Sequence, residues 1–256
     1  MHDFLEDKNF KELEAENFGA KNDEGPMTLE IFTQLMKQFY DLGWMRGSGG
    51  ALGCVAGKQL MISPSALQKE RIKPEEVFIY DLVSKSEIQR PINKKITVSS
   101  CSVLFSLIMN QTGSECVIHT HSKAANLLTQ LISADTFEIS HQEYIKGIYD
   151  PFSGHALKYN DTLVIPIINN RPSESLLLNP IEGVLQSHPQ AIAVLVRNHG
   201  LFVWGPTWES AKIMVECIDY LLELSIEMLK NNIPLVKEVQ VEREDSVDYL
   251  ETVFSP

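Results

Sequence analysis

Two histidines separated by one residue give the clearest chemical signal in the sequence. His119 and His121 follow a short apolar run at residues 116–118, which is typical of a buried strand. Residues two apart in an extended chain face the same side, so both imidazoles can reach one ion. An open catalytic zinc site takes a third protein ligand, and His199 is the best candidate because it also follows an apolar strand. The alternative is that all three are ordinary polar residues at strand ends.

A carboxylate and a thiol are further candidates for chemistry. Glu143 follows a short expected strand and would act there as an acid or base; a solvated loop glutamate is the alternative. Cys101 lies at an expected helix start, behind Ser99 and Ser100. A helix N-terminus lowers the pKa of a thiol and favours anion contacts, whereas a small buried helix residue is the plain alternative.

Three loops carry amides and hydroxyls that could hold an anion. The glycine-rich stretch at residues 47–50 offers backbone amides to a phosphate. It lacks the Gly-Lys-Ser/Thr ending of a P-loop and follows a helix, so a dinucleotide fingerprint is not indicated. A plain turn is the alternative for each loop. The candidate anion contacts are Gly49, Gly50, Ser65, Ser99 and Ser100.

The elements that must position these residues alternate along the chain. Apolar spacing and caps predict helices over residues 28–42, about 99–113, 122–131 and 207–231. Short apolar segments predict strands over residues 59–62, 77–81, 116–119, 137–140, 162–168, 191–197 and 201–204. Pro166 suggests an edge strand or a bulge. The alternation predicts a sheet covered by helices on both faces.

Composition places the chain among globular proteins. The 256 residues carry 22 Lys and Arg against 34 Asp and Glu, a formal net charge of -12, and 44% are hydrophobic. This balance predicts one domain at residues 26–236, between a mobile acidic arm at 1–25 and an acidic tail at 237–256. No basic stripe is present to neutralise phosphates, so a nucleic-acid partner is not expected. No apolar run approaches the ~20 residues that a membrane span needs.

The cysteines and the N-terminus indicate the compartment. The four cysteines are far apart and form no CxxC pair, which argues against a disulfide framework and a zinc ribbon. The first residues lack the basic and apolar regions of a secretory signal. We therefore expect a cytoplasmic protein.

Taken in order, several strings resemble the class II aldolase family, a zinc-dependent group of sugar-phosphate lyases and epimerases. The shorter segments that match the family are the glycine-rich stretch, the paired serines, the histidine pair and two segments at residues 62–65 and 197–200. Longer strings are similar to a dehydratase branch of the family, and they lie at residues 38–44, 68–72, 117–125, 141–148 and 204–209. The resemblance covers about residues 27–236.

The resemblance implies a three-layer α/β/α fold with a mainly antiparallel central sheet, assembled as a homotetramer with active sites near subunit interfaces. It implies one Zn²⁺ per subunit, held by His119, His121 and His199. It also implies Glu143 as the catalytic acid/base and Cys101 as a substrate contact. The phosphate of a sugar phosphate would lie near Gly49, Gly50, Ser65, Ser99 and Ser100.

One position favours dehydration over carbon–carbon cleavage. In the related aldolases a glutamate follows the paired serines, whereas this sequence has Cys101 there and Glu143 in a dehydratase-type string. The resemblance thus implies dehydration of 5-methylthioribulose 1-phosphate to 5-methylthio-2,3-dioxopentyl 1-phosphate in methionine salvage. The alternatives are a class II sugar-phosphate aldolase or epimerase, or a non-catalytic cell-death regulator on the same fold. An interaction with Apaf-1 is implied by the resemblance alone.

Three positions depart from the dehydratase pattern. Ala51 stands where another glycine is usual, Gly53 where serine is usual, and Ala66 where glycine is usual. Alanine at a turn that needs a positive φ destabilises the turn or shifts its amides. We therefore expect these positions to affect the phosphate subsite most.

Overall fold

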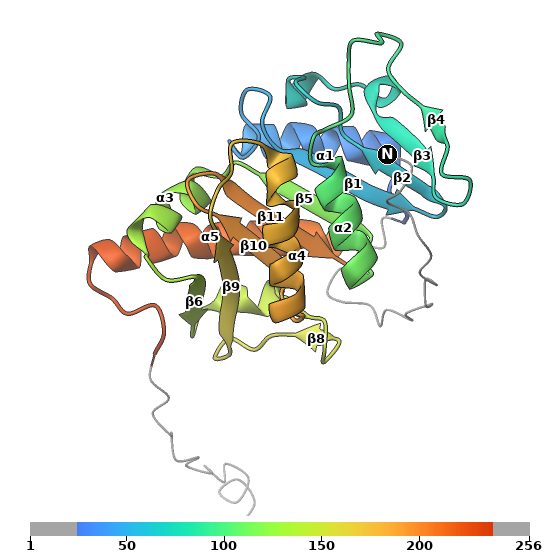
Figure 1. Ribbon diagram of the computed structural model, residues 1–256. Helices are drawn as coiled ribbons and strands as arrows, with labels where there is room; N and C mark the ends of the chain where they lie inside the picture. The colour runs from blue at the N-terminus through green and yellow to red at the C-terminus, as the bar shows by residue number, and fades with distance from the viewer. Residues whose placement is uncertain (1–24, 238–256) are drawn as a thin grey trace, which may run out of the picture.

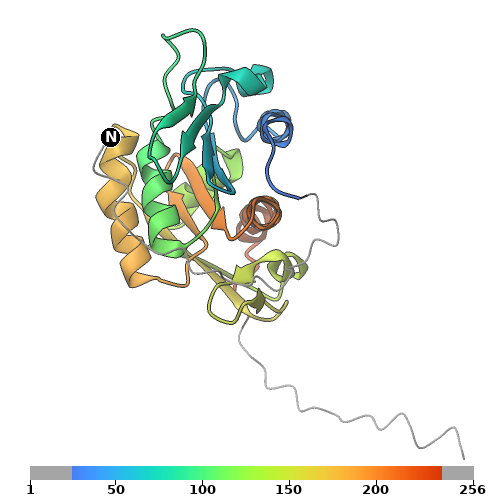
Figure 2. The ribbon, with the colours of Figure 1, turned by 90° about the vertical axis from the view of Figure 1, so that its right-hand side faces the viewer.

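A nine-stranded sheet lies between two layers of helices in the computed structural model, which describes residues 25–237 (Figures 1 and 2). The strand order is β4-β3-β2-β1-β5-β11-β10-β9-β6. Every pairing is antiparallel except the parallel one between β9 and β10. The expected α/β fold with a mainly antiparallel central sheet is confirmed. The expected arm and tail lie outside the described residues, apart from Gly25 and Lys237 at their borders.

The candidate histidines lie near the centre of the sheet. The sheet consists of β1 (Ala51–Ala56), β2 (Gln59–Ile62), β3 (Phe78–Asp81), β4 (Glu87–Gln89), β5 (Cys116–Thr120), β6 (Thr136–Ser140), β9 (Thr162–Ile168), β10 (Ala193–Val196) and β11 (Gly200–Gly205). A separate pair is formed by β7 (Tyr149–Asp150) and β8 (His155–Ala156). His119 of β5 pairs with Ala51 of β1 and with Phe202 of β11. The end of β5 therefore lies beside the starts of both neighbours.

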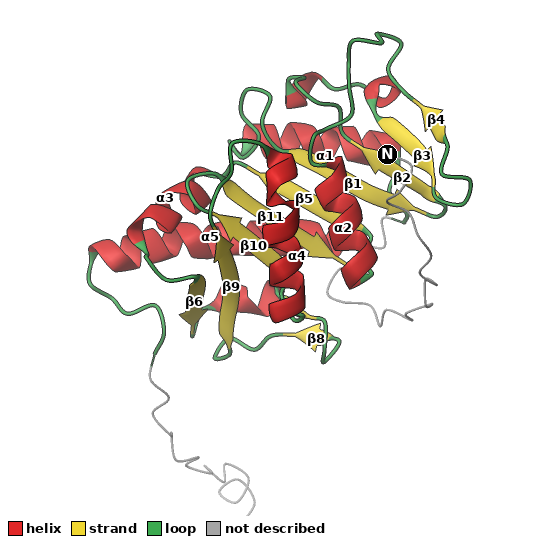
Figure 3. Cartoon of the chain, viewed as in Figure 1, coloured by secondary structure: helices red, strands yellow, loops and turns green. Residues whose placement is uncertain are grey.

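Helices cover both faces, as the views in Figures 2 and 3 show. One layer holds α1 (Leu29–Asp41), α3 (Lys123–Leu131) and α5 (Trp208–Lys230), and the other holds α2 (Ser102–Thr112) and α4 (Leu178–Ser187). The side chains of Thr28, Ser122 and Thr207 accept hydrogen bonds from the first turns of α1, α3 and α5, which satisfies otherwise free helix N–H groups. Four short 3-10 helices are η1 (Lys69–Arg71), η2 (Pro74–Glu76), η3 (Glu143–Gly147) and η4 (Glu174–Leu177).

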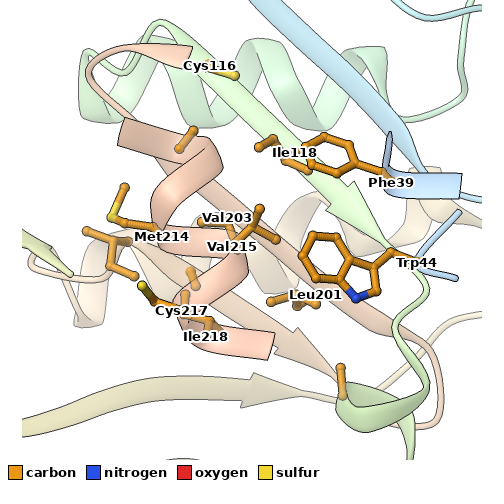
Figure 4. Packing of buried hydrophobic residues seen from close by; sticks show 14 of the residues in the cluster. Phe39, Trp44, Cys116, Ile118, Leu201, Val203, Met214, Val215, Cys217 and Ile218 are labelled. Carbon is orange, nitrogen blue, oxygen red and sulfur yellow. The ribbon is translucent and has the colours of Figure 1, made fainter. Parts of the chain in front are cut away.

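A hydrophobic core lies on each face of the sheet. Figure 4 shows part of the core beneath α5, where Trp44 lies near Leu201 and Phe39 near Ile118. These side chains are all buried, and burying one side chain of this size stabilises the fold by about 1.5–3 kcal/mol. The second core packs α2 and α4 on the opposite face. The strands β5, β10 and β11, which contain or flank the histidines, are thus packed from both sides.

The expectation of an edge strand or a bulge at Pro166 is wrong. The strand β9 lies between β10 and β6, and its register with β6 is regular. Ile167 N donates to Asp135 O on the β6 side, so the nitrogen of Pro166 faces β10, and pairing with β10 begins only at Ile167. Because Pro166 itself is not paired with β10, its lack of an N–H group removes no hydrogen bond from the sheet. Within residues 25–237 no helix is both long and apolar enough to cross a membrane.

Candidate metal centre

Three histidines meet at the end of β5. The Nε2 atom of His121 lies 3.0 Å from Nε2 of His119 and 2.9 Å from Nε2 of His199. His119 belongs to β5, His121 follows it directly, and His199 lies in the turn between β10 and β11. A divalent ion in tetrahedral coordination, with nitrogens about 2.0–2.1 Å away, separates its ligands by about 3.3 Å. Movements of a few tenths of an ångström would therefore admit such an ion.

Hydrogen bonds to the outer ring nitrogens orient two of the imidazoles. His119 Nδ1 lies 3.0 Å from Leu201 O, and His199 Nδ1 lies 3.1 Å from Asn170 Oδ1. Both partners are acceptors, so these Nδ1 atoms carry the protons and the Nε2 lone pairs point inward. Among the three rings, only His121 could carry its proton on Nε2. That proton could form a hydrogen bond to Nε2 of His119 or of His199, but not to both. Such a set of lone pairs is suited to a cation.

The electrostatics keep the histidines neutral. Burial is the largest cause of the lowered pKa of each: the pKa of His119 falls well below its usual value, that of His121 falls to about 4, and that of His199 is also lowered. His121 and His199 also lower the pKa of His119, and His199 lowers that of His121. Neutral imidazole is the form that binds a metal ion. The residues present therefore fit a divalent metal.

A carboxylate completes the group. Ligand atoms of Glu174 and the three histidines all lie within 4.8 Å of one another. Glu174 begins η4, in the same loop after β9 that carries Asn170. Its Oε2 also accepts a hydrogen bond from Ser100 Oγ. We call His119, His121, His199 and Glu174 the metal group. Through the contact of Glu174 with Ser100, the metal group adjoins the predicted anion-binding loops.

A buried aspartate, Asp219, accepts hydrogen bonds from the side chains of two residues that adjoin His121. Asp219 of α5 is 6% exposed and accepts hydrogen bonds from Trp44 Nε1, at 2.7 Å, and from Ser122 Oγ. The carbonyl of Trp44 accepts from His121 N at 2.8 Å. Burial raises the pKa of Asp219, while its two hydrogen bonds act against this. Asp219 therefore connects α5 to the residues that flank a candidate ligand.

The glycine-rich loop approaches the histidines closely. A Cβ atom on Gly49 would lie 2.5 Å from His121 Nδ1, and one on Gly50, whose φ is +73°, would lie 2.9 Å from His119 O. A side chain at either position would push the ring or the strand away. These two glycines thus allow the loop to lie against the metal group.

The two serine loops lie side by side. Ser65 N donates to Thr97 O at 2.8 Å, and Ser99 N donates to Ser63 O at 3.1 Å. Ser99 Oγ accepts from Cys101 N at 3.3 Å. The structure therefore brings together the predicted phosphate contacts of both loops at the start of α2. Their role towards a phosphate stays a prediction.

Of the two interpretations of Cys101, the small buried helix residue is confirmed, and a lowered thiol pKa is wrong. Cys101 does stand at the N-cap of α2, but its side chain is 2% exposed. Burial raises the pKa of the thiol well above its usual value, and the charge of Glu174 raises it further. Desolvation outweighs the helix terminus. Cys101 is a neutral thiol next to the metal group.

Glu143 lies outside the metal group. It begins η3, its side chain is 72% exposed, and its carboxylate pairs with Lys146 at 2.7 Å. The neighbouring Tyr144 stacks on Tyr220 of α5, with ring centroids 3.9 Å apart. The described contacts do not join Glu143 to the histidines of the same chain. Its role as acid/base stays a prediction.

The three departures from the family pattern differ in their backbone. Ala51 opens β1 and does not have a positive φ, so it carries no strain there. A Cβ atom on Gly53 would lie 2.6 Å from the ring of Phe105, so glycine fits this core. Ala66, in contrast, has a φ of +57°. Only the loop of Ser65 therefore shows the expected strain.

Sequence reasoning missed Glu174, Asp219 and Lys69. Glu174 reaches the histidines only through the return of the chain after β9, and no local pattern marks it. Asp219 interrupts the buried face of α5, which is a readable signal because a buried carboxylate needs partners. Lys69 lies in a string that carries the family resemblance, and its side chain is 1% exposed.

Comparison with known proteins assigns the chain to a family. The model for the class II aldolase and adducin N-terminal domain matches residues 30–226. A Caenorhabditis elegans protein named "Probable methylthioribulose-1-phosphate dehydratase" is 73% identical over 248 residues, covering 96% of this chain and 94% of the relative. The Mus musculus methylthioribulose-1-phosphate dehydratase is 44% identical over 212 residues, covering 83% and 87%.

A solved structure gives the same fold. The L-fuculose-1-phosphate aldolase of Thermus thermophilus matches with a TM-score of 0.58 and 17% identity, over 80% of this chain and 98% of that one. At this identity the likeness concerns the fold alone. Together, the model match, the close relatives and the shared fold show that the chain belongs to the class II aldolase and adducin family.

Proposed function

We propose that this chain is a zinc-dependent hydro-lyase that dehydrates 5-methylthioribulose 1-phosphate to 5-methylthio-2,3-dioxopentyl 1-phosphate in methionine salvage. The observation that carries the proposal is the meeting of three neutral Nε2 atoms beside the start of α2, where the residue after the paired serines is a thiol, Cys101. The identity of 73% with a relative of that name supports the substrate. An aldolase would need its acid/base at the position of Cys101.

The metal is proposed to be one zinc ion per subunit, held by His119, His121 and His199. Zinc prefers nitrogen ligands, and a catalytic site leaves one position open for water or substrate. When bound, it supplies Lewis-acid polarisation of the C2 carbonyl, which acidifies the C3 proton. Glu174 lies within reach of the same position. Its carboxylate would have to move aside as the substrate enters.

The proton steps are assigned to Glu143. Its carboxylate takes the C3 proton as general base and returns a proton to the C4 hydroxyl, which leaves as water. The resulting enol then tautomerises to the 2,3-diketone. Cys101, as a neutral thiol, would contact the substrate without accepting the C3 proton. The predicted phosphate contacts are Gly49, Gly50, Ser65, Ser99 and Ser100.

The proposed homotetramer offers a place for Glu143. Its side chain is exposed, and the stacked Tyr144 and Tyr220 beside it are each close to half exposed. Contiguous exposed aromatic groups are typical of protein interfaces. We propose that Glu143 of one subunit faces the metal group of its neighbour. The predicted interaction with Apaf-1 stays a prediction that rests on the family resemblance.

The reaction assay separates the candidates. The purified full chain is incubated with 5-methylthioribulose 1-phosphate and, separately, with L-fuculose 1-phosphate, and the products are identified by NMR. The proposal predicts loss of one water from the first substrate and no change in the second. Cleavage to dihydroxyacetone phosphate would identify an aldolase, and inversion of a hydroxyl without loss of water would identify an epimerase. No turnover by the zinc-loaded protein would favour a non-catalytic role.

A further inference from the structure

Lys69 is a buried cation in the wall of the candidate site. Its side chain is 1% exposed, and Nζ donates a hydrogen bond to Pro64 O at 3.2 Å. An ammonium has three N–H donors, and among the described residues no carboxylate lies within 4.0 Å of this one. A buried charge without an anionic partner is unfavourable. An anion bound beside Lys69 would therefore stabilise its buried charge.

The charged groups near Lys69 indicate where an anionic ligand would bind. Burial is the largest influence on Lys69 and lowers its pKa to about 8, while the charge of the nearby Glu174 carboxylate favours the ammonium and acts against this. Lys69 in turn disfavours protonation of His119 and His121. The ammonium is therefore close both to the start of α2 and to the metal group.

The local backbone places Lys69 where the two serine loops meet. It opens η1, directly after the loop that contains Ser65. Its hydrogen bond to Pro64 O ties the side chain back to that loop, and Pro64 pairs with Val98 of the loop before α2. The Glu174 carboxylate bound to Ser100 Oγ shows that this place accepts an anionic oxygen group.

We propose that Lys69 is the charge partner of the substrate phosphate and a determinant of specificity for phosphorylated sugars. The α2 N–H groups and the serine hydroxyls supply directional hydrogen bonds, and the ammonium supplies the charge that they lack. The identity of the sugar rests on the proposed function. The preference for a phosphate dianion rests only on this buried cation and its neighbours.

A structural role and a binding role make different predictions for uncharged variants. Lys69→Met keeps the length of the side chain and removes a desolvated charge, which is often neutral or stabilising for a fold. Lys69→Gln also removes the charge, but its amide N–H can still donate to Pro64 O. Lys58→Met is the matched control, because Lys58 is exposed in the turn between β1 and β2.

The test is binding of inorganic phosphate to the zinc-loaded full chain, measured by calorimetry and by the phosphate-dependent rise in Tm. We expect wild type and Lys58→Met to bind equally, and Lys69→Met to bind at least 10-fold more weakly at unchanged zinc content. If Lys69→Met does not fold, Lys69→Gln must show the same loss. With the sugar phosphate as substrate, KM should rise at least 10-fold while kcat changes less.

Two results would overturn the proposal: equal phosphate binding by wild type and a folded uncharged variant, or no phosphate binding by wild type at all. Neither measurement requires turnover. If phosphate binding depends on Lys69 but the wild type does not dehydrate the sugar, Lys69 keeps its role and the proposed function fails. If the wild type dehydrates the sugar and the uncharged variants bind phosphate normally, only the role of Lys69 fails.

Discussion

The metal group and the Glu143 region differ in how the fold prepares them for chemistry. His119, His121 and His199 come from the centre of the sheet, where hydrogen bonds to Leu201 and Asn170 orient two rings. Glu143 is 72% exposed, on a 3-10 helix, with a surface lysine as its partner. One chain thus brings the candidate metal ligands together and leaves the proposed acid/base exposed.

The difference indicates where assembly matters. A surface ion pair such as Glu143 with Lys146 is worth about 0–1 kcal/mol, so this carboxylate is free to take another partner. The histidines have less freedom, because β5, β10 and β11, which contain or flank them, are packed on both faces. We therefore expect metal binding to be a property of the subunit and proton transfer to be a property of the assembly.

The largest effect is expected from Glu143→Gln. This change keeps the size of the side chain and removes the base, so turnover should fall by at least ~10²-fold. Zinc content and Tm should stay unchanged, because the metal group is untouched. Steady-state kinetics, metal analysis and calorimetry on one sample check this.

The control for Glu143→Gln is Lys146→Ala, which removes the ion pair, leaves the carboxylate in place and should retain turnover. A further comparison uses Cys101→Ala, which should weaken substrate binding and keep exchange of the C3 proton with solvent. Near-normal turnover by Glu143→Gln, together with lost proton exchange in Cys101→Ala, would move the base to the helix start.

Mixing inactive subunits tests whether Glu143 acts across an interface. His121→Ala subunits lack the metal, and Glu143→Gln subunits lack the base. When the two are unfolded together and reassembled in equal amounts, about a quarter of the sites should pair intact histidines with an intact Glu143 of a neighbour. Turnover should therefore recover from the background to about a quarter of the wild-type rate. No recovery in confirmed mixed tetramers would place Glu143 with the metal of its own chain.

A smaller effect is expected from Asp219→Asn. The asparagine has one acceptor oxygen where the carboxylate accepts from both Trp44 and Ser122, so the backbone around His121 should be held less firmly. Loss of such supporting groups typically lowers metal affinity by about 10–100-fold. Competition with a chelator of known affinity measures this, and Glu223→Gln, an exposed position on the same helix, serves as the control. Unchanged zinc affinity in a destabilised variant would assign Asp219 to stability alone.

The smallest effect concerns the loop of Ser65, beside the metal group. Ala66 has a positive φ, which costs a residue with a Cβ atom roughly 1–2 kcal/mol. Ala66→Gly should therefore raise the free energy of unfolding by about 1 kcal/mol, as measured by urea denaturation. Ala51→Gly, in a strand without positive φ, should lower it by about 0.5–1 kcal/mol. A change of the same sign in both variants would refute the strain at Ala66.

Local patterns predicted the parts of the fold that depend on local chemistry. Helices were expected to begin at about residues 28, 122 and 207, and Thr28, Ser122 and Thr207 do cap α1, α3 and α5. Strands β2 and β9 have the expected bounds. Helix α4 was missed, as Pro180 and a run of leucines obscure its period. Strand β1 was not predicted, because its alanines and glycine carry little strand signal.

The site was predictable where spacing implied geometry. His119 and His121 are two positions apart, which places both on one side of an extended chain, and their Nε2 atoms do meet. Glu174 and Lys69 lie far from the histidines in sequence, so only the packed fold brings them near. The pKa of Cys101 could not be predicted, because the depth of burial that raises it depends on tertiary packing.

The most direct test of the account couples metal content to dehydration in one experiment. The purified full chain is stripped with a chelator and titrated with Zn²⁺, while conversion of 5-methylthioribulose 1-phosphate to the diketone is followed. The account predicts no conversion without metal and a rise in rate that ends at one zinc per chain, with His121→Ala inactive throughout. Full conversion by the metal-free chain, or by His121→Ala without bound zinc, would contradict it.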